Sequence, residues 1–295
     1  MTEAVQILVR GLGVGSAYAL LALGFVIIYK SSRVISFAQP AFMLSGAVLL
    51  SYLVGPFGFF LALPLAALGT GVLALGVERI AVRPMVGRPA FTIAIITLGV
   101  DVIVRTVAQN FIGIDLRQVG DPWGLRQTAI LGIPVQQRHV AMIIVAVAVV
   151  AALLAFFRYT RMGLAMRAAA YDQEAAMAQG VSVGGVFAFS WGIAGALAAI
   201  GGALAAAGGS VESTLWVIAL VALPVIILGG LDSVPGAVVG GMLVGLIQEV
   251  VGQYQRLFPE WLGGNVSVIS AYVLMLAVLV VRPYGLFGTA EVERV

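Results

Sequence analysis

The sequence VQILVRGLGVGSAYALLALGFVIIY, residues 5–29, contains a single charged residue, Arg10. At about 1.5 Å per residue, a helix of this length exceeds the roughly 30 Å of hydrocarbon in a bilayer. The buried strands of soluble α/β proteins are also apolar, but such runs stop after about 4–8 residues. The apolar core of a signal peptide is also shorter. Residues 5–29 therefore predict a transmembrane helix.

Similar apolar runs recur along the whole chain. Hydrophobic residues make up 61% of the 295 residues and charged residues only 10%, with a mean hydropathy of +1.10. So few charges cannot cover a soluble globule of this size. We expect an all-α fold, a polytopic transmembrane bundle of about eight to ten helices that forms one permease-like domain over residues 1–295. The predicted spans are residues 5–29, 41–54, 57–77, 90–112, 140–157, 186–207, 215–228, 237–251 and 266–281.

Basic residues are concentrated in alternate connections between these spans. The connections richer in lysine and arginine face the cytoplasm under the positive-inside rule. This places the N-terminus outside and the C-terminus in the cytoplasm. The cytoplasmic set is Lys30, Arg33, Arg79, Arg83, Arg88, Arg158, Arg161, Arg167 and Arg282, and the opposite set is Arg117, Arg126, Arg138 and Arg256.

Two predicted spans are short and begin near a proline. Residues 41–54 follow SFAQP, and residues 237–251 follow LDSVPG. Each would span about 21–23 Å. In transporters, paired short segments of this kind can be broken helices whose positive N-terminal ends face the substrate. The alternative is a pair of ordinary capped helices with slight hydrophobic mismatch. The candidate substrate-path residues are Ser36, Phe37, Gln39, Pro40, Asp232, Ser233 and Pro235.

Asp101 and Arg105 are charged residues inside the predicted span 90–112. Their spacing of four places them on one helix face, where they can pair. Intramembrane charges are costly and are often functional, but a pair can also fasten its helix to a neighbour. The sequence leaves both roles open. The scarcity of other acidic residues deep in the spans disfavours a proton-driven or ion-driven carrier.

Several kinds of chemistry are absent from the sequence. The chain has no cysteine, which excludes disulfides, thiolate metal sites and cysteine nucleophiles. Its one histidine, His139, is expected in a solvated loop, so we predict no metal site. Lys30 is the only lysine and follows Tyr29, so the chain lacks the Walker A motif. We expect no catalytic residue and no cofactor in this chain.

Residues 160–185, TRMGLAMRAAAYDQEAAMAQGVSVGG, form a polar interruption between two apolar spans. Arg167, Tyr171 and Glu174 have i, i+4, i+7 spacing, which places them in one stripe on a helix. Gly180 is suited to a left-handed helix cap. A helix lying on a membrane would carry bulkier apolar residues. The segment therefore predicts a cytoplasmic helix that docks into a partner. The candidate docking residues are Arg167, Tyr171, Asp172, Glu174, Ala175, Ala176 and Gly180.

The sequence resembles a known transporter family in four ordered blocks. EAAMAQG (174–180) is similar to the EAA motif of ABC importer permeases, which forms the coupling helix that sits in a cleft of an ATP-hydrolysing subunit. Three further blocks resemble LivH-type permeases of branched-chain amino acid importers, with departures at Ser36, Pro40 and Asp232. These blocks are GVGSAYALLALGFVIIYKSSRVISFAQPAFMLSGA (13–47), ILGGLDSVPGAVVGGMLVGLIQ (227–248) and VLMLAVLVVRPYGLFG (273–288).

The resemblance implies a permease subunit of a binding-protein-dependent ABC importer in the bacterial cytoplasmic (inner) membrane. Residues 160–185 would be its coupling-helix loop. The implied partners are a second homologous permease, two subunits that bind ATP and Mg²⁺, and an extracytoplasmic binding protein. The outer loops 113–139 and 252–265 carry charges of both signs, which suit transient contact with the binding protein. The candidate contacts are Arg117, Asp121, Trp123, Arg126, Arg256 and Glu260.

The substrate implied by the resemblance is a branched-chain or related amino acid. Urea, short amides or other small organic acids are alternative cargoes for the same permease role, because similar permeases carry them. A stand-alone secondary carrier or channel is an alternative of another class, in which residues 160–185 would have no partner.

Overall fold

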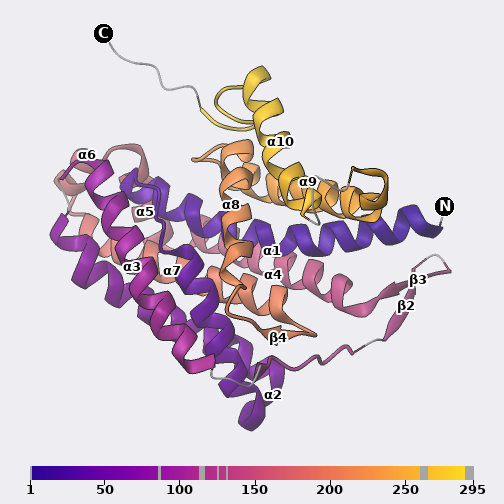
Figure 1. Ribbon diagram of the computed structural model, residues 1–295. Helices are drawn as coiled ribbons and strands as arrows, with labels where there is room; N and C mark the ends of the chain where they lie inside the picture. The colour runs from indigo at the N-terminus through magenta and orange to yellow at the C-terminus, as the bar shows by residue number, and fades with distance from the viewer. Residues whose placement is uncertain are drawn as a thin grey trace.

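The computed structural model describes residues 2–85, 88–112, 117–124, 126–130, 132–259 and 265–289. It confirms the all-α bundle (Figure 1). Six of the described helical stretches are long and apolar enough to cross a membrane. The α-helices are α1 (Thr2–Ser32), α2 (Gln39–Val77), α3 (Ala90–Ile112), α4 (Gln137–Tyr159), α5 (Arg161–Tyr171), α6 (Gln173–Ala178), α7 (Val183–Ala206), α8 (Trp216–Gly229), α9 (Val234–Gln253) and α10 (Val266–Val281).

Short elements complete the described chain. The strands form two antiparallel pairs, β1 with β4 and β2 with β3. The strands are β1 (Arg117–Gln118), β2 (Gln127–Ile130), β3 (Ile133–Gln136) and β4 (Ser210–Val211). Single turns of other helix types are η1 (Glu78–Val82), η2 (Arg83–Met85) and η3 (Gln255–Leu257).

The helix α2 contains two of the predicted spans. Its backbone leaves the helical conformation at Gly58, where φ is 68° and ψ is 163°. The halves pack together, because a methyl group at Gly69 would lie 3.3 Å from Leu49 Cδ1. Residues 41–54 and 57–77 therefore form a helical hairpin with its turn near Gly58.

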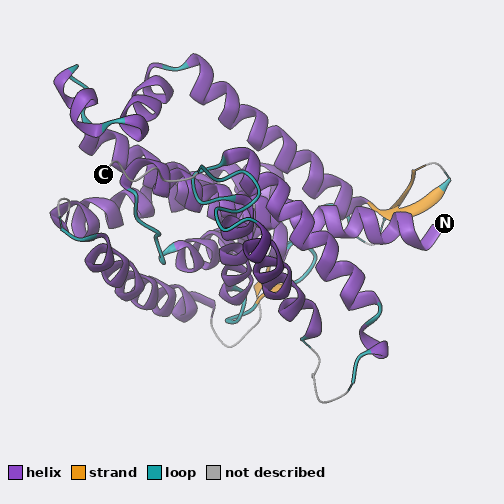
Figure 2. Ribbon diagram, turned by 90° about the horizontal axis from the view of Figure 1, so that it is seen from above, coloured by secondary structure: helices purple, strands orange, loops and turns teal. Residues whose placement is uncertain are grey.

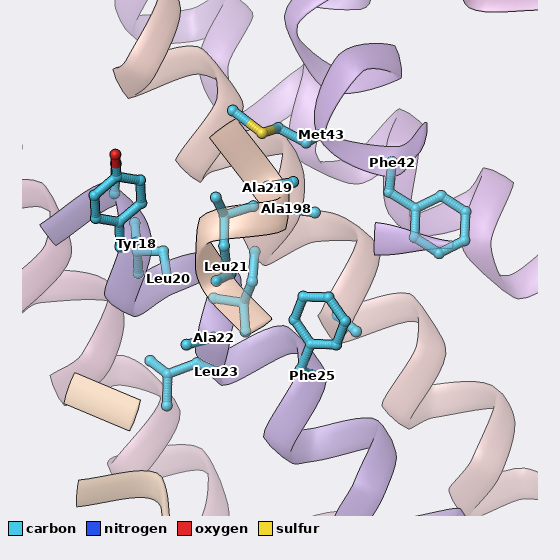
Figure 3. Packing of buried hydrophobic residues seen from close by; sticks show 14 of the residues in the cluster. Tyr18, Leu20, Leu21, Ala22, Leu23, Phe25, Phe42, Met43, Ala198 and Ala219 are labelled. Atoms are coloured by element: carbon cyan, nitrogen blue, oxygen red, sulfur yellow. The ribbon is translucent and has the colours of Figure 1, made fainter. Parts of the chain in front are cut away.

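The helix α1 is the centre of the bundle and contacts α9, α7, α4 and α8. From Gly15 to Ile28 every residue of α1 is buried. Figure 3 shows Leu21 of α1 below Met43 of α2 and Ala219 of α8, in the same buried cluster as Leu20 and Leu23. A helix buried on all sides is protein-facing throughout, so α1 is the element against which the others are placed.

Glycines allow the neighbours of α1 to approach its backbone. A methyl group at Gly15 would lie 2.7 Å from the carbonyl oxygen of Gly241 in α9, and one at Gly241 would lie 2.6 Å from the amide nitrogen of Ala19. The helices α2 and α7 cross in the same way, since a methyl group at Gly202 would lie 2.5 Å from the Met43 carbonyl oxygen. Lipid supplies no hydrophobic drive between helices, so close packing of small residues holds such bundles together.

The two ends of the bundle carry different elements. At one end, called here the strand end, Gln6 Nε2 in α1 donates a hydrogen bond to the Pro134 carbonyl oxygen in β3 at 2.8 Å. At the other, called the α5–α6 end, Gln173 Nε2 in α6 donates to the Ser31 carbonyl oxygen in α1 at 3.0 Å. Figure 2 shows the N-terminus beside the strands and the α5–α6 region away from them.

The last described residues fold back onto the junction of α8 and α9. The amide of Leu286 donates to the Leu228 carbonyl oxygen at 2.8 Å, and that of Phe287 donates to the Gly229 carbonyl oxygen at 3.0 Å. Two blocks quoted above, residues 227–248 and 273–288, therefore meet in one local structure.

The structure differs from the expectations for residues 237–251 and for His139. The second predicted short span is α9, whose 20 residues reach about 30 Å, so the expected shortness is wrong. Pro235 does lie in its first turn, and Ser233 Oγ accepts from the Gly236 amide at 3.0 Å. His139 does not lie in a solvated loop. It is buried in the first turn of α4 against Gly13.

The α1–α9 crossing gives a direct test of packing. We expect Gly241→Ala to lower stability by about 1–3 kcal/mol, because the methyl group must push α9 away from Ala19. A matched control is Gly99→Ala, where nothing lies within 4 Å of the added methyl group and helix propensity favours alanine. Thermal unfolding of both purified variants in one detergent measures the difference. Equal melting temperatures would contradict the packing role.

Candidate coupling surface and substrate path

The helix α5 rests on the end of α4. Thr160 Oγ1 accepts from the Gly163 amide at 2.9 Å, which caps the first turn of α5. Gly163 has no side chain between the two helices, and a methyl group there would lie 2.6 Å from Phe157 Cα. Met166 and Ala169 are buried on the same side. The opposite face of α5 is left exposed.

The predicted single docking helix is two helices in the structure. The backbone is extended at Asp172, with φ −152° and ψ 111°, and Asp172 Oδ1 accepts from the Ala175 amide at 2.9 Å. An aspartate in this position is a favourable N-cap. Arg167 and Tyr171 therefore lie on α5, whereas Glu174 lies on α6, and the three do not share one helical stripe.

Gly180 adopts the left-handed conformation expected for a helix cap, with φ 81°. The amide of Val181 donates to the Ala176 carbonyl oxygen at 3.0 Å, which is the long hydrogen bond of a Schellman motif. This cap ends α6, and the chain then turns toward α7.

The outer faces of α5 and α6 form one exposed surface. Of the seven predicted docking residues, only Ala176 is buried, and Tyr171 is 95% exposed. Charged, aromatic and apolar side chains are mixed on this surface, and Tyr and Arg are common at the energetic centres of interfaces. We define the α5–α6 surface as Leu164, Arg167, Tyr171, Asp172, Glu174, Ala175, Met177 and Gly180.

The first predicted path turn re-enters the bundle after α1. Arg33 has a φ of 56°, which reverses the chain after Ser32. The helix α2 then starts at Gln39, whose side-chain nitrogen Nε2 lies 2.5 Å from the position a methyl group at Gly24 would take. Gly24 precedes the last residue of α1 by eight positions, or about 12 Å along the helix. The N-terminus of α2 therefore lies inside the bundle, as a broken helix would.

Side chains satisfy the non-helical backbone of this turn. The amide of Phe37 donates to Thr97 Oγ1 in α3 at 3.0 Å, and the amide of Ala38 donates to Ser36 Oγ at 3.3 Å. Irregular backbone at membrane depth requires such internal partners. Ser36, Gln39 and Pro40 are buried, and Phe37 is half-buried.

Gln39 has a polar side chain without a polar partner. Both amide atoms of Gln39 are buried and form no hydrogen bond with any described residue, and the same is true of Trp191 Nε1 in α7. The Trp191 ring contacts Phe42 edge-on, with 6.2 Å between centroids. An unsatisfied buried amide costs about 1–3 kcal/mol, so such a group marks a site for a polar ligand or for a change of conformation.

The second predicted path turn lies elsewhere. Asp232 and Ser233 are half-buried and Pro235 is exposed, at the α5–α6 end of the bundle. The Asp232 carboxylate accepts from the hydroxyl group of Thr289. The structure therefore does not bring Asp232, Ser233 and Pro235 together with Gln39.

Asp101 and Arg105 form the expected intrahelical pair, with 3.1 Å between Arg105 Nη2 and Asp101 Oδ2. The Arg105 guanidinium also lies 4.0 Å from the ring centroid of Trp216 in α8. This contact connects α3 to α8, as the fastening role requires.

The predicted binding-protein contacts lie at the strand end. Trp123 packs on Phe59, with ring centroids 5.2 Å apart, and Asp121 Oδ1 accepts from the Trp123 amide at 3.1 Å. Arg126 and Arg256 are exposed. The side chain of Arg117 and all of Glu260 fall outside the described residues.

Contacts between α1 and α9 were missed by the sequence analysis. Tyr18 Oη donates to Gln248 Oε1 at 2.7 Å in the bundle interior, and Arg10 Nε lies 3.0 Å from Glu249 Oε1. Arg10, a lone charge in an apolar span, was the available signal.

A glycine-packed bundle of long apolar helices, one of which starts inside the bundle, is the architecture of a multi-pass membrane protein. Residues 7–281 match the family described as branched-chain amino acid transport system / permease component. The chain belongs to this family, whose members are inner-membrane transport subunits rather than enzymes.

Named relatives cover almost the whole chain. The high-affinity branched-chain amino acid transport system permease protein BraD of Pseudomonas aeruginosa is 27% identical, over 98% of this chain and 97% of its own. The corresponding LivH of Escherichia coli K12 gives the same three values. A probable LivH of Methanocaldococcus jannaschii is 27% identical over 91% of this chain and 88% of its own.

A solved structure, PsaBC from Streptococcus pneumoniae in complex with Fab, covers 93% of this chain and 90% of its own, with a TM-score of 0.49 and 14% identity. The family assignment therefore rests on the sequence matches.

Proposed function

We propose that this chain is the permease subunit of a binding-protein-dependent ABC importer that moves branched-chain or related amino acids into the cytoplasm. The family match supports the class of transporter. The observation that supports the mechanism is the exposure of the α5–α6 surface. In this proposal that surface docks into an ATP-binding subunit. ATP and Mg²⁺ are bound by two such subunits, and a second homologous permease completes the pathway.

The contacts of α5 and α6 suggest how force reaches the pathway. The helix α5 packs on α4 through Gly163, and α6 is bonded to the end of α1 through Gln173. Closure of the ATP-binding subunits would therefore pull on α4 and α1 together. Because Gly24 of α1 lies against Gln39, tilting of α1 would open or close the buried start of α2.

In this proposal the substrate passes beside the start of α2. The Gln39 amide supplies polar contacts, and the N-terminal end of α2 favours the substrate carboxylate. The α5–α6 end faces the cytoplasm and the strand end faces outward. The exposed Arg126 and Arg256 then meet the binding protein, which sets most of the selectivity.

The first test concerns coupling. We expect Glu174→Lys and Gly180→Asp to leave the permease inserted at normal abundance but to lower ATP-driven uptake at least about tenfold, the effect of losing one strong interface contact. Uptake and ATP hydrolysis are measured in vesicles that contain the whole transporter.

Glu212→Lys is the matched control, because Glu212 is exposed outside the α5–α6 surface and undergoes the same charge change. Full uptake by both coupling variants would remove the coupling assignment. Uptake by the purified chain without any ATP-binding subunit would favour the stand-alone carrier.

A second test concerns the path. We expect Gln39→Ala to raise the KM for uptake about fivefold, the effect of losing roughly 1 kcal/mol of hydrogen bonding to the substrate. Gln109→Ala is the control, because Gln109 in α3 bonds the Ser213 carbonyl oxygen instead. An unchanged KM for Gln39→Ala in an intact complex would exclude Gln39 from the path.

A third test concerns the binding protein. We expect Arg126→Glu and Arg256→Glu each to raise about fivefold the binding-protein concentration that gives half-maximal uptake, with a weaker dependence on salt. Arg158→Glu, at the end of α4 near α5, is the charge-matched control. If the control shows the same change, these two arginines do not form the docking site.

The cargo is decided by a separate measurement. The ligand that the binding protein retains on purification distinguishes amino acids from urea, short amides or other organic acids.

A further inference from the structure

Two adjoining cavities lie at the α5–α6 end of the bundle. An apolar cavity of about 190 Å³ lies among α1, α4, α5 and α9. A second cavity of about 290 Å³ lies beside it. Lys30, Arg167 and Ala170 line both, so the two cavities adjoin at these residues.

The first cavity is suited to a hydrocarbon chain. Its walls include Ile27, Leu154, Phe157, Met166 and Val234. Leu154 is 51% exposed on α4, one of the six candidate membrane spans. The cavity is therefore reached from the apolar surface that faces lipid.

The second cavity is cationic. Lys30, Arg33 and Arg167 line it together with one carboxylate, Asp232. Among the residues that the structure describes, none of these three cations is within ion-pair distance of a carboxylate. Asp232 is already bonded to Thr289. The described residues that line this cavity thus carry three positive charges and one negative charge.

The cavities lie at the boundary between membrane and water. The helices α1 and α4 end at Ser32 and Tyr159, close to these basic residues, and tyrosines such as Tyr29 and Tyr159 are typical of that boundary. Basic pockets between transmembrane helices bind the head groups of anionic lipids.

We propose that these cavities bind one anionic phospholipid. An acyl chain fills the apolar cavity, the phosphate lies between Lys30 and Arg167, and the rest of the head group faces Arg33 and Asp232. A phospholipid is favoured over free phosphate because the apolar and cationic cavities adjoin and share Lys30, Arg167 and Ala170. The lipid connects α1 to α5, so it stabilises the support of the α5–α6 surface whether or not the transport proposal holds.

The test uses the full-length chain in phosphatidylcholine nanodiscs, with and without phosphatidylglycerol. We expect phosphatidylglycerol to raise the melting temperature, and native mass spectrometry to show it retained on the released protein in preference to phosphatidylcholine. Inorganic phosphate should give no stabilisation. Equal retention of the two lipids, or equal stabilisation by phosphate, would overturn the proposal.

Variants separate this site from general attraction to an anionic surface. Lys30→Gln and Ala170→Leu should each lower retention of phosphatidylglycerol about fivefold, the first by removing a cation and the second by filling the shared boundary. Lys30→Arg should keep it. Arg158→Gln removes a charge nearby but lines neither cavity, so it should also keep retention. If Lys30→Gln and Ala170→Leu behave like Arg158→Gln, the site does not exist.

Discussion

The close approach of other backbones to α1 is the constraint on which this bundle depends. In lipid, apolar side chains gain little by leaving their surroundings, so helices are held by contacts that short separations make possible. Gly15 and Gly241 bring α9 onto α1, and Gly24 leaves room for the side chain of Gln39. The same helix thus fixes the bundle interior and the depth at which α2 begins.

Several polar side chains of this chain connect helices inside the bundle. Thr97 satisfies the turn before α2, Arg105 is shared between Asp101 and Trp216, and Tyr18 is paired with Gln248. These polar contacts connect different helices and are directional. They therefore fix how the helices are placed along one another, which close packing of glycine and alanine alone does not do. The amide of Gln39 departs from this pattern.

Hydropathy predicted most of the fold, because a membrane span must be long and continuous. The predicted spans 90–112 and 266–281 coincide with α3 and α10. Hydropathy does not predict contacts between segments that are distant in the sequence. The alanine-rich sequence around Asp172 did not indicate that this residue would cap a new helix. No local pattern indicated that Ser36 and Gln39 lie inside the bundle while Asp232 lies at the α5–α6 end. The exposure of the α5–α6 surface was predictable from its charges. The hydrogen bond from Gln173 of α6 to Ser31 of α1 was not.

The hydrogen bonds of Leu286 and Phe287 to the end of α8 have a consequence for biosynthesis. A ribosome delivers α8 and α9 to the membrane before it has made these two residues. Until they emerge, the carbonyl groups of Leu228 and Gly229 lack their final donors, and the α8–α9 junction is incomplete. The α8–α9 junction therefore becomes complete only after α10 and the segment that follows it have been made.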